Sequence, residues 1–308
     1  MIITVTTNPA IDFSIITNQV ALGQVQVIDE AIETVGGKGI NVSKVLNLFR
    51  VSNSATGFLG KENAHVFFDF FDSNGMIHDF VLVEGKTRTN IKVNETAAGR
   101  TTDLNAKGFL VTKPCQEALL NKIVLIAKKS NYVVLSGSLP QGCGDDFYAK
   151  IVSMIMHDTM VVVDADKQKL RLAVEAGAHI IKPNKREIEQ AFNKTFSSDQ
   201  DCVAFCIGLI KEYSLEKVLL TLGENGAVMI TEKAIVYSKP IAVEVMGTVG
   251  AGDSFLGGCL AGFDQGFSDV DAFKMGVACG TCAVLQKGTD IFSLDAFQKI
   301  FKRMRVVQ

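Results

Sequence analysis

The sequence predicts an α/β protein with a mainly parallel central β-sheet and helices on both faces. Runs such as 133–138, 160–163 and 218–223 are apolar throughout instead of alternating, which is typical of strands buried on both faces. Longer stretches with helical periodicity separate these runs, so helices are expected to connect successive strands. A chain of 308 residues, 47% of them hydrophobic, can bury a large core in one or two domains.

The sequence predicts strands and helices that alternate along the chain. A strand is expected over 2–7, and a helix over 39–50, because its residues Val42, Val45 and Leu46 share one face. The β-branched composition predicts the following further strands: 133–138, 160–166, 179–184, 218–223 and 241–246. The remaining expected helices are 145–156, with acidic residues in its first turn, 167–176, 185–192, 200–213, 252–265 and 269–286.

Two segments, 11–35 and 88–110, do not follow the strand–helix pattern. Both contain alternating polar and apolar residues with little helical signal. We expect them to pair into a small antiparallel β-sheet that forms a lid over the large sheet or a dimer contact. The large α/β domain would then comprise residues 1–10, 36–87 and 111–308.

Charge and hydropathy exclude several classes of protein. The formal net charge is −2, without any block of five like charges, so we expect no nucleic-acid or membrane binding. Apolar runs are far shorter than the roughly 18 residues of a membrane span, and the first residues do not resemble a signal peptide. The seven cysteines, including CGTC at 279–282, are interpreted as buried thiols of a cytoplasmic protein rather than a zinc or redox site.

Polar residues follow the predicted strands, at the edge of an α/β sheet where ligands usually bind. They include Asn8, Pro9, Asp12, Ser136, Gly137, Ser138, Asp164, Asp166, Lys182, Asn184, Glu187, Gly223, Asn225 and Gly226. A polar rim made by so many separate loops favours an enzyme over a scaffold.

The stretch GTVGAGDSFLGG (247–258) joins a predicted strand to a predicted helix. It lacks the lysine of a P-loop, and Phe255 takes the place of the third glycine of a dinucleotide-binding loop. The glycines alone fit a tight turn equally well. At a helix N-terminus, however, free amides from Gly250 to Asp253 would bind an oxyanion, and Asp253 would accept a proton. This combination suits phosphoryl transfer.

Other candidates have a structural and a functional interpretation. VGGKGINVS (35–43) is a strand-to-helix turn, or a sugar-binding loop in which Lys38 reaches a phosphate. Arg88 is a solvated surface cation or a phosphate contact. Asn184 and Glu187, three residues apart, form a helix capping box or hold a hydrated Mg²⁺ ion.

Together these stretches resemble the PfkB-type, ribokinase-like sugar kinases. The matching stretches occur in order along nearly the whole chain: TVTTNPAIDFS, GGKGINVS, TRTN, VVLSGSLPQG, KPNKREIE, LLTLGENGA and TVGAGDSF. Within that family the chain is most similar to the branch of 1-phosphofructokinases and tagatose-6-phosphate kinases. The resemblance implies a ribokinase-like fold with a small β lid, which often dimerises.

The resemblance also implies roles for individual residues. Asp253 matches the catalytic base, next to an anion hole formed by the amides of Gly250, Ala251 and Gly252. The substrate-binding positions are Asp12, Gly37, Lys38, Asn41, Arg88, Asn90, Ser136 and Gly137, with Lys38 and Arg88 as phosphate contacts. The ATP-binding positions are Thr221, Gly223, Glu224, Asn225, Gly226, Thr248, Gly250, Ala251, Gly252 and Gly280. Asn184 and Glu187 match a motif associated with Mg²⁺.

The chain departs from its relatives at three places. GQVQV (23–27) has Gln26 where a basic residue is usual, and NAKGF (105–109) introduces Lys107 in the lid. DADKQ (164–168) replaces a small serine- and glycine-containing stretch. We hypothesise that Lys107 partly replaces the missing cation at position 26.

The expected activity is ATP- and Mg²⁺-dependent phosphorylation of a ketohexose monophosphate, with fructose 1-phosphate as the favoured substrate. Tagatose 6-phosphate is the alternative substrate. A 6-phosphofructokinase and a catalytically silent sugar or nucleotide sensor rank lower, and a dehydrogenase lower still. We also expect a monovalent cation near the glycine loop and a homodimer formed through the lid.

Overall fold

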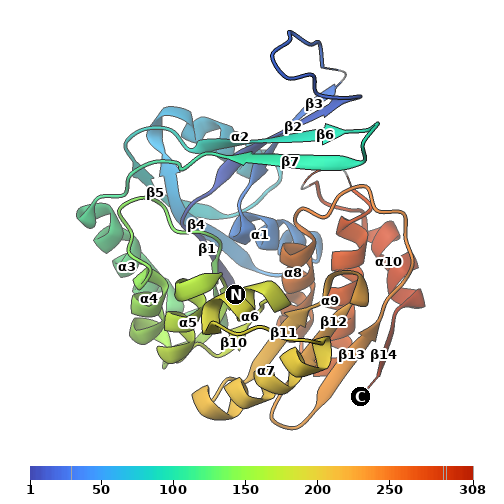
Figure 1. The fold of residues 1–308 in the computed structure, drawn as a ribbon. Helices are drawn as coiled ribbons and strands as arrows, with labels where there is room; N and C mark the ends of the chain where they lie inside the picture. Colours follow the sequence, from blue (N-terminus) through green and yellow to red (C-terminus); the bar gives the residue numbers. More distant parts are fainter. Residues whose placement is uncertain (29, 287, 289, 308) are drawn as a thin grey trace.

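A ten-stranded β-sheet forms the centre of the computed structural model, which describes residues 1–28, 30–286, 288 and 290–307 (Figure 1). In the order in which they lie across the sheet, its strands are β14 (Arg305–Val307), β13 (Ile235–Lys239), β12 (Ala227–Ile230), β11 (Lys217–Thr221), β10 (Ile180–Ile181), β9 (Met160–Asp164), β8 (Tyr132–Ser136), β1 (Ile2–Thr6), β4 (Asn53–Gly60) and β5 (His78–Val83). All pairings from β11 to β5 are parallel, whereas β12, β13 and β14 extend the sheet by antiparallel pairing.

Helices cover both faces of this sheet, as the apolar strands predict (Figure 1). On one face lie α3 (Lys113–Ala127), α4 (Phe147–Ile155), α5 (Lys167–Glu175), α6 (Lys185–Phe192) and α7 (Asp199–Tyr213). On the other lie α1 (Lys38–Leu48), α2 (Ala64–Ser73), α8 (Ala251–Asp264), α9 (Asp269–Ala283) and α10 (Leu294–Arg303). Two short 3-10 helices, η1 (Lys61–Asn63) and η2 (Gly223–Asn225), interrupt the loops.

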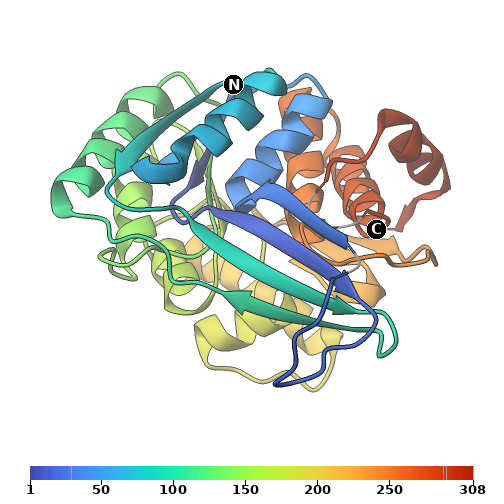
Figure 2. The ribbon, with the colours of Figure 1, turned by 90° about the horizontal axis from the view of Figure 1, so that it is seen from above.

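A second, four-stranded sheet lies across the carboxyl ends of the large sheet's parallel strands (Figure 2). Its strands, in spatial order, are β3 (Glu30–Gly36), β2 (Ala10–Thr17), β6 (Arg88–Glu95) and β7 (Arg100–Asn105). The predicted antiparallel pairing is confirmed for β2–β3 and β6–β7. It is wrong for β2–β6, the pair that joins the two distant segments, because each of these strands leaves the carboxyl end of a parallel strand, β1 or β5, and runs outward in the same direction.

Two predicted strands differ from the structure. Residues 241–246 form no strand: β13 ends before Pro240, which cannot donate a backbone hydrogen bond, and Met246 N instead donates to Val284 O at 2.8 Å. The strand predicted over 179–184 is reduced to β10, because Pro183 follows it and Asn184 already caps α6.

The structure also bears on the predictions about the cysteines and about membrane-spanning helices. All seven cysteines are free. Five of them, including both cysteines of the CGTC stretch, are buried, whereas Cys115 and Cys143 are half-buried, so the expectation of buried thiols is wrong for these two. Within the part of the chain that the structure describes, no helix has the length and apolar character needed to cross a bilayer.

Candidate active site

A cavity of about 520 Å³ lies between the carboxyl ends of the parallel strands and the small sheet. Register brings these strand ends together, since Thr6 pairs with Ser136 and Ser136 pairs with Asp164. The predicted positions that line the cavity are Asp12, Gly37, Lys38, Asn41, Arg88, Asn90, Ser136, Gly137, Asn184, Glu187, Thr221, Gly250, Gly252 and Asp253. Segments that are distant in sequence therefore meet at the site that their positions after strands predict.

Helix α8 points its N-terminus at this cavity. Its N-cap, Gly250, has a φ of 76°, a left-handed conformation that glycine adopts without strain. Among the described residues no side chain caps the helix, which leaves its first-turn amides available to a ligand. The predicted glycine turn at a helix N-terminus is therefore present, and the helix dipole favours negative charge there.

Asp253 lies in the first turn of α8 and is only 7% exposed. Asn41 Nδ2 of α1 donates a 2.8 Å hydrogen bond to Asp253 Oδ2, which fixes the orientation of the carboxylate. Burial raises the pKa of Asp253, although Lys38 and the hydrogen bond from Asn41 lower it in part. A buried carboxylate with a raised pKa is a stronger base than an exposed aspartate.

Two lysines converge on the buried carboxylate of Asp164, at the end of β9. Lys38 Nζ lies 2.9 Å and Lys182 Nζ 3.2 Å from the same oxygen, Asp164 Oδ1. Burial opposes the charged forms, yet the two ammonium groups lower the pKa of Asp164, and Asp164, Asp253 and Glu187 raise the pKa of Lys38. Lys38 thus remains a cation, and it lies with Lys182 beside the N-terminus of α8, where both can contact a phosphoryl group.

Several buried polar atoms around the cavity have no hydrogen-bond partner among the described residues. They are Thr6 Oγ1, Asn8 Oδ1, Asn41 Oδ1, Asn90 Oδ1, Ser136 Oγ and Asp164 Oδ2. Unpartnered buried polar atoms are costly, so their concentration at one cavity favours a polar ligand or ordered water there.

The small sheet contributes a cluster of polar side chains on β2 and β6 to the cavity. Asp12 of β2 accepts a 3.1 Å hydrogen bond from Asn90 Nδ2 and lies 3.7 Å from Lys92 Nζ, both on β6. Arg88, on the same strand, donates to the backbone oxygens of Asn8, Pro9 and Ala106. Arg88 thereby ties the small sheet to the loop after β1, and burial lowers its pKa.

The structure contains the predicted capping box at the start of α6. Asn184 Oδ1 accepts from Glu187 N and Glu187 Oε2 accepts from Asn184 N, each at 2.8 Å. Glu187 Oε1 stays outside the box, 3.7 Å from Lys38 Nζ. Searching the described residues finds no cluster of three or more His, Cys, Asp or Glu side chains arranged to hold a metal. A Mg²⁺ ion here would depend on waters and phosphate oxygens, which is a coordination that Mg²⁺ favours.

Some predicted ATP-binding positions do not line the cavity: Gly223, Glu224, Asn225, Gly226, Thr248, Ala251 and Gly280. The first four form the η2 turn after β11, where Asn225 Nδ2 donates to Asp199 Oδ2 at 2.9 Å. Gly280 lies at the contact between α9 and α8, since a Cβ there would be 3.2 Å from Ala251 O. Their role in nucleotide binding stays a prediction.

Three charged residues of the site, Asp164, Lys182 and Lys92, were not assigned a role from the sequence. Asp164 and Lys182 follow strands, so their position was a usable signal. Lys92 alternates with Asn90 on a strand, which was a usable signal too. By contrast, Gln26 and Lys107 are exposed and do not line the cavity; Gln26 Nε2 donates to Gln19 O within its own loop.

The fold and site define a class of protein, and comparisons with known proteins agree. Residues 6–296 match the pfkB family carbohydrate kinases, and the chain belongs to this family. It is therefore a phosphotransferase with an alcohol group as acceptor and ATP as co-substrate.

Two 1-phosphofructokinases and one solved phosphofructokinase structure are similar to this chain over nearly its whole length. The 1-phosphofructokinase of Borreliella burgdorferi is 33% identical over 99% of this chain and 96% of its own length. The 1-phosphofructokinase of Haemophilus influenzae is 30% identical over 99% and 97%. The structure of phosphofructokinase-2 from Escherichia coli in complex with potassium is 25% identical and superposes with a TM-score of 0.91 over 98% of both chains. The chain is thus a full-length homologue of 1-phosphofructokinases with the ribokinase-like fold.

Proposed function

We propose that this enzyme phosphorylates fructose 1-phosphate at its C6 hydroxyl, giving fructose 1,6-bisphosphate. The observation that carries the proposal is the buried Asp253 beside the open amides of α8, with Lys38 and Lys182 at the same end of the cavity. The full-length similarity to 1-phosphofructokinases supports fructose 1-phosphate as the substrate.

In this mechanism Asp253 accepts the proton of the C6 hydroxyl while its oxygen attacks the γ-phosphorus of ATP. A new P–O bond forms, the bond to the ADP oxygen breaks, and the three equatorial oxygens carry the charge. The amides of Gly252 and Asp253, together with Lys38 and Lys182, bind those oxygens. Proton acceptance of this kind contributes a rate factor of about 10² to 10⁴.

The residues at the start of α6 fit Mg²⁺ as a hydrated ion bound mainly by phosphates. Glu187 Oε1 is the oxygen left over by the capping box, and it lies 3.7 Å from Nζ of Lys38, one of the two lysines proposed to bind the phosphoryl group. When bound with ATP, Mg²⁺ would offset charge on the phosphates. Thr221, at the end of β11, lies on this side of the cavity and is proposed with the η2 turn as part of the nucleotide site.

The proposal includes a lid that closes on the substrate and a homodimer formed through it. The face of the small sheet opposite the cavity carries a row of apolar side chains, because Phe13, Ile91 and Leu104 are register partners across β2, β6 and β7. Leu104 is 56% exposed, which is unfavourable for a single copy. If Leu104→Asp has the same molar mass by light scattering as the parent protein, this dimer surface is wrong.

A coupled assay of ADP release tests the proposed substrate. Fructose 1-phosphate, tagatose 6-phosphate, fructose 6-phosphate and the free sugars are compared at equal enzyme and ATP. We expect the highest kcat/KM with fructose 1-phosphate, and a higher value with tagatose 6-phosphate would replace the proposal with the alternative activity. Repeating the best reaction with K⁺ exchanged for a bulky organic cation tests the expected monovalent cation.

A further inference from the structure

One side of strand β6 presents three polar side chains to the cavity, Arg88, Asn90 and Lys92, while Thr89 and Ile91 between them are exposed. This alternation follows from the period of a β-strand. Arg88 and Lys92 are therefore the two cations of this strand that a bound anion can meet.

Arg88 is largely committed within the protein. Its guanidinium donates to the backbone oxygens of Asn8, Pro9 and Ala106 at 3.0–3.3 Å and to Ser138 Oγ at 3.4 Å. These bonds use four of the five N–H donors that a guanidinium offers. Binding a phosphate through Arg88 would require most of them to break.

Lys38 and Lys182 are committed to Asp164 and to the start of α8. Both contact Asp164 Oδ1, and Gly252 lies so near Lys182 that a Cβ there would be 3.4 Å from its Nζ. They accompany the N-terminus of α8, where the transferred phosphoryl group is expected. The two ends of a ketohexose bisphosphate cannot both bind there.

Lys92, unlike Arg88, is not held by hydrogen bonds from its side chain to other described residues. Its side chain is only 10% exposed, yet among the described residues its ammonium makes no hydrogen bond. Its ion-pair partner, Asp12 Oδ2, is 3.7 Å away, and the other oxygen of Asp12 already accepts from Asn90. A nearly buried ammonium with unused donors is costly unless an anion binds it.

We propose that Lys92, beside Asp12, recognises the phosphate that the substrate already carries. This inference rests on the proposed function, since it assumes a phosphorylated sugar. It assigns discrimination between phosphorylated and free sugars to a strand of the small sheet, in place of Arg88 and of the altered positions Gln26 and Lys107.

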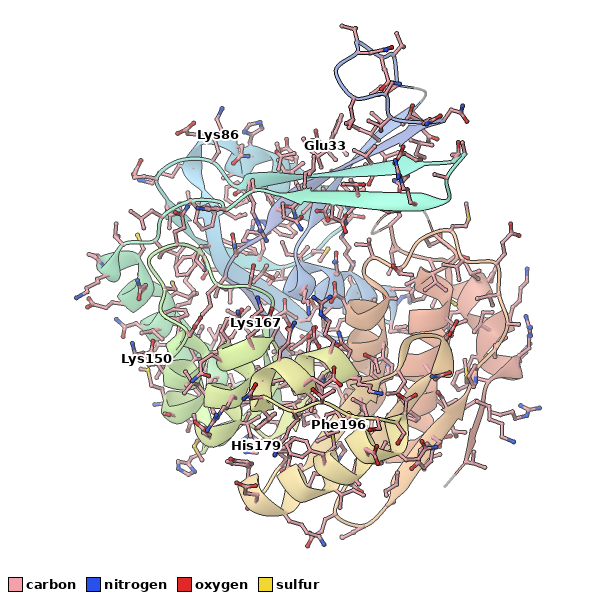
Figure 3. The ribbon with its side chains drawn as sticks, viewed as in Figure 1. Glu33, Lys86, Lys150, Lys167, His179 and Phe196 are labelled. Carbon is pink, nitrogen blue, oxygen red and sulfur yellow. The ribbon has the colours of Figure 1, made fainter. Side chains whose placement is uncertain are left out.

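The test compares Lys92→Met with Lys92→Arg and with the control Lys86→Met. Lys86 lies in the loop before β6, away from the cavity lining, and its side chain is 70% exposed (Figure 3). Steady-state rates are measured with fructose 1-phosphate and ATP, and direct binding of fructose 1-phosphate is measured by calorimetry. Thermal unfolding of each variant verifies that it is folded.

For Lys92→Met we expect both the KM and the Kd for fructose 1-phosphate to rise about 10- to 100-fold, the worth of a charged hydrogen bond. The KM for ATP should stay within about threefold of that of the parent enzyme, and Lys92→Arg should recover most of the affinity. Lys86→Met should match the parent enzyme in every measurement.

The two proposals fail separately. If the parent enzyme does not phosphorylate fructose 1-phosphate, the proposed function is wrong. If it does, and folded Lys92→Met keeps the parent KM and Kd, the assignment of Lys92 is wrong while the proposed function stands. A fall in kcat with unchanged Kd also refutes the assignment, because it places Lys92 at the chemical step.

Discussion

Replacing Asp253 with asparagine separates catalysis from stability at the centre of the site. The substitution keeps the size of the side chain and an oxygen that can accept from Asn41 Nδ2, now 2.8 Å from Asp253 Oδ2. It removes the negative charge and the ability to accept a proton. We expect kcat to fall about 10²- to 10⁴-fold, which corresponds to about 3–5 kcal/mol of transition-state stabilisation.

The same substitution, Asp253→Asn, should not lower the stability of the protein. Three buried or half-buried carboxylates, Asp164, Glu187 and Asp253, face the ammonium groups of Lys38 and Lys182. Burial raises the pKa of Asp253, so its ionised form is less favourable in the folded chain than in the unfolded one. Removing that charge should leave the Tm unchanged or raise it.

The assay combines single-turnover kinetics with ATP, calorimetric binding of ATP, and thermal unfolding at neutral pH. A variant that folds, binds ATP and has lost turnover supports Asp253 as the base. Turnover within threefold of the parent enzyme would refute the base assignment. A large fall in Tm would refute the electrostatic argument, because Asp253 would then be a stabilising partner of the lysines.

Further predictions concern the surrounding residues. Asp164→Asn should lower the free energy of unfolding by about 3–5 kcal/mol, measured by urea titration, because two buried lysines lose their common partner; an unchanged midpoint would contradict this. Since the pKa of Asp253 is raised, kcat/KM should decline on acidification through a pKa above the ordinary value of about 3.8, and a flat profile down to pH 4 would argue against it. Glu187→Gln keeps a capping oxygen, so it should preserve the Tm while raising the Mg²⁺ concentration needed for half-maximal rate; Glu187→Ala should also lose about 0.5–2 kcal/mol of stability. Gly57→Ala would place a Cβ 1.9 Å from Thr6 O at a φ of 139°, so a loss of at least about 3 kcal/mol in chemical denaturation is expected, and a neutral effect would contradict it.

Much of the candidate site could be predicted because its residues occupy fixed places relative to secondary structure. A polar residue directly after a buried parallel strand must lie at the ligand-binding edge, which applies to Ser136, Asn184 and Thr221. The amides of Gly250–Asp253 were predictable for a similar reason, since a glycine-rich turn before an apolar helix leaves its N-terminus uncapped. The family resemblance added the catalytic role of Asp253.

Long-range contacts decided the rest. Lys38 meets Asp164 across 126 positions of the sequence, on the same oxygen that Lys182 contacts, and no local pattern specifies this convergence. The sequence did not distinguish a capping box from a metal site at Asn184 and Glu187. In the structure the capping box forms and leaves one oxygen of Glu187 outside it.

The sequence by itself determined the fold class, the edge of the sheet where the candidate site lies and the glycine turn that precedes Asp253. These follow from hydrophobic period and from turn chemistry, which act over a few residues. Only the tertiary structure decided that β2 and β6 pair in parallel, that Arg88 is held by backbone oxygens, and that Lys92 lies beside Asp12 without a hydrogen bond to any described residue. Such outcomes depend on which distant groups compete for each hydrogen bond and charge, and that competition is settled only when the chain has folded.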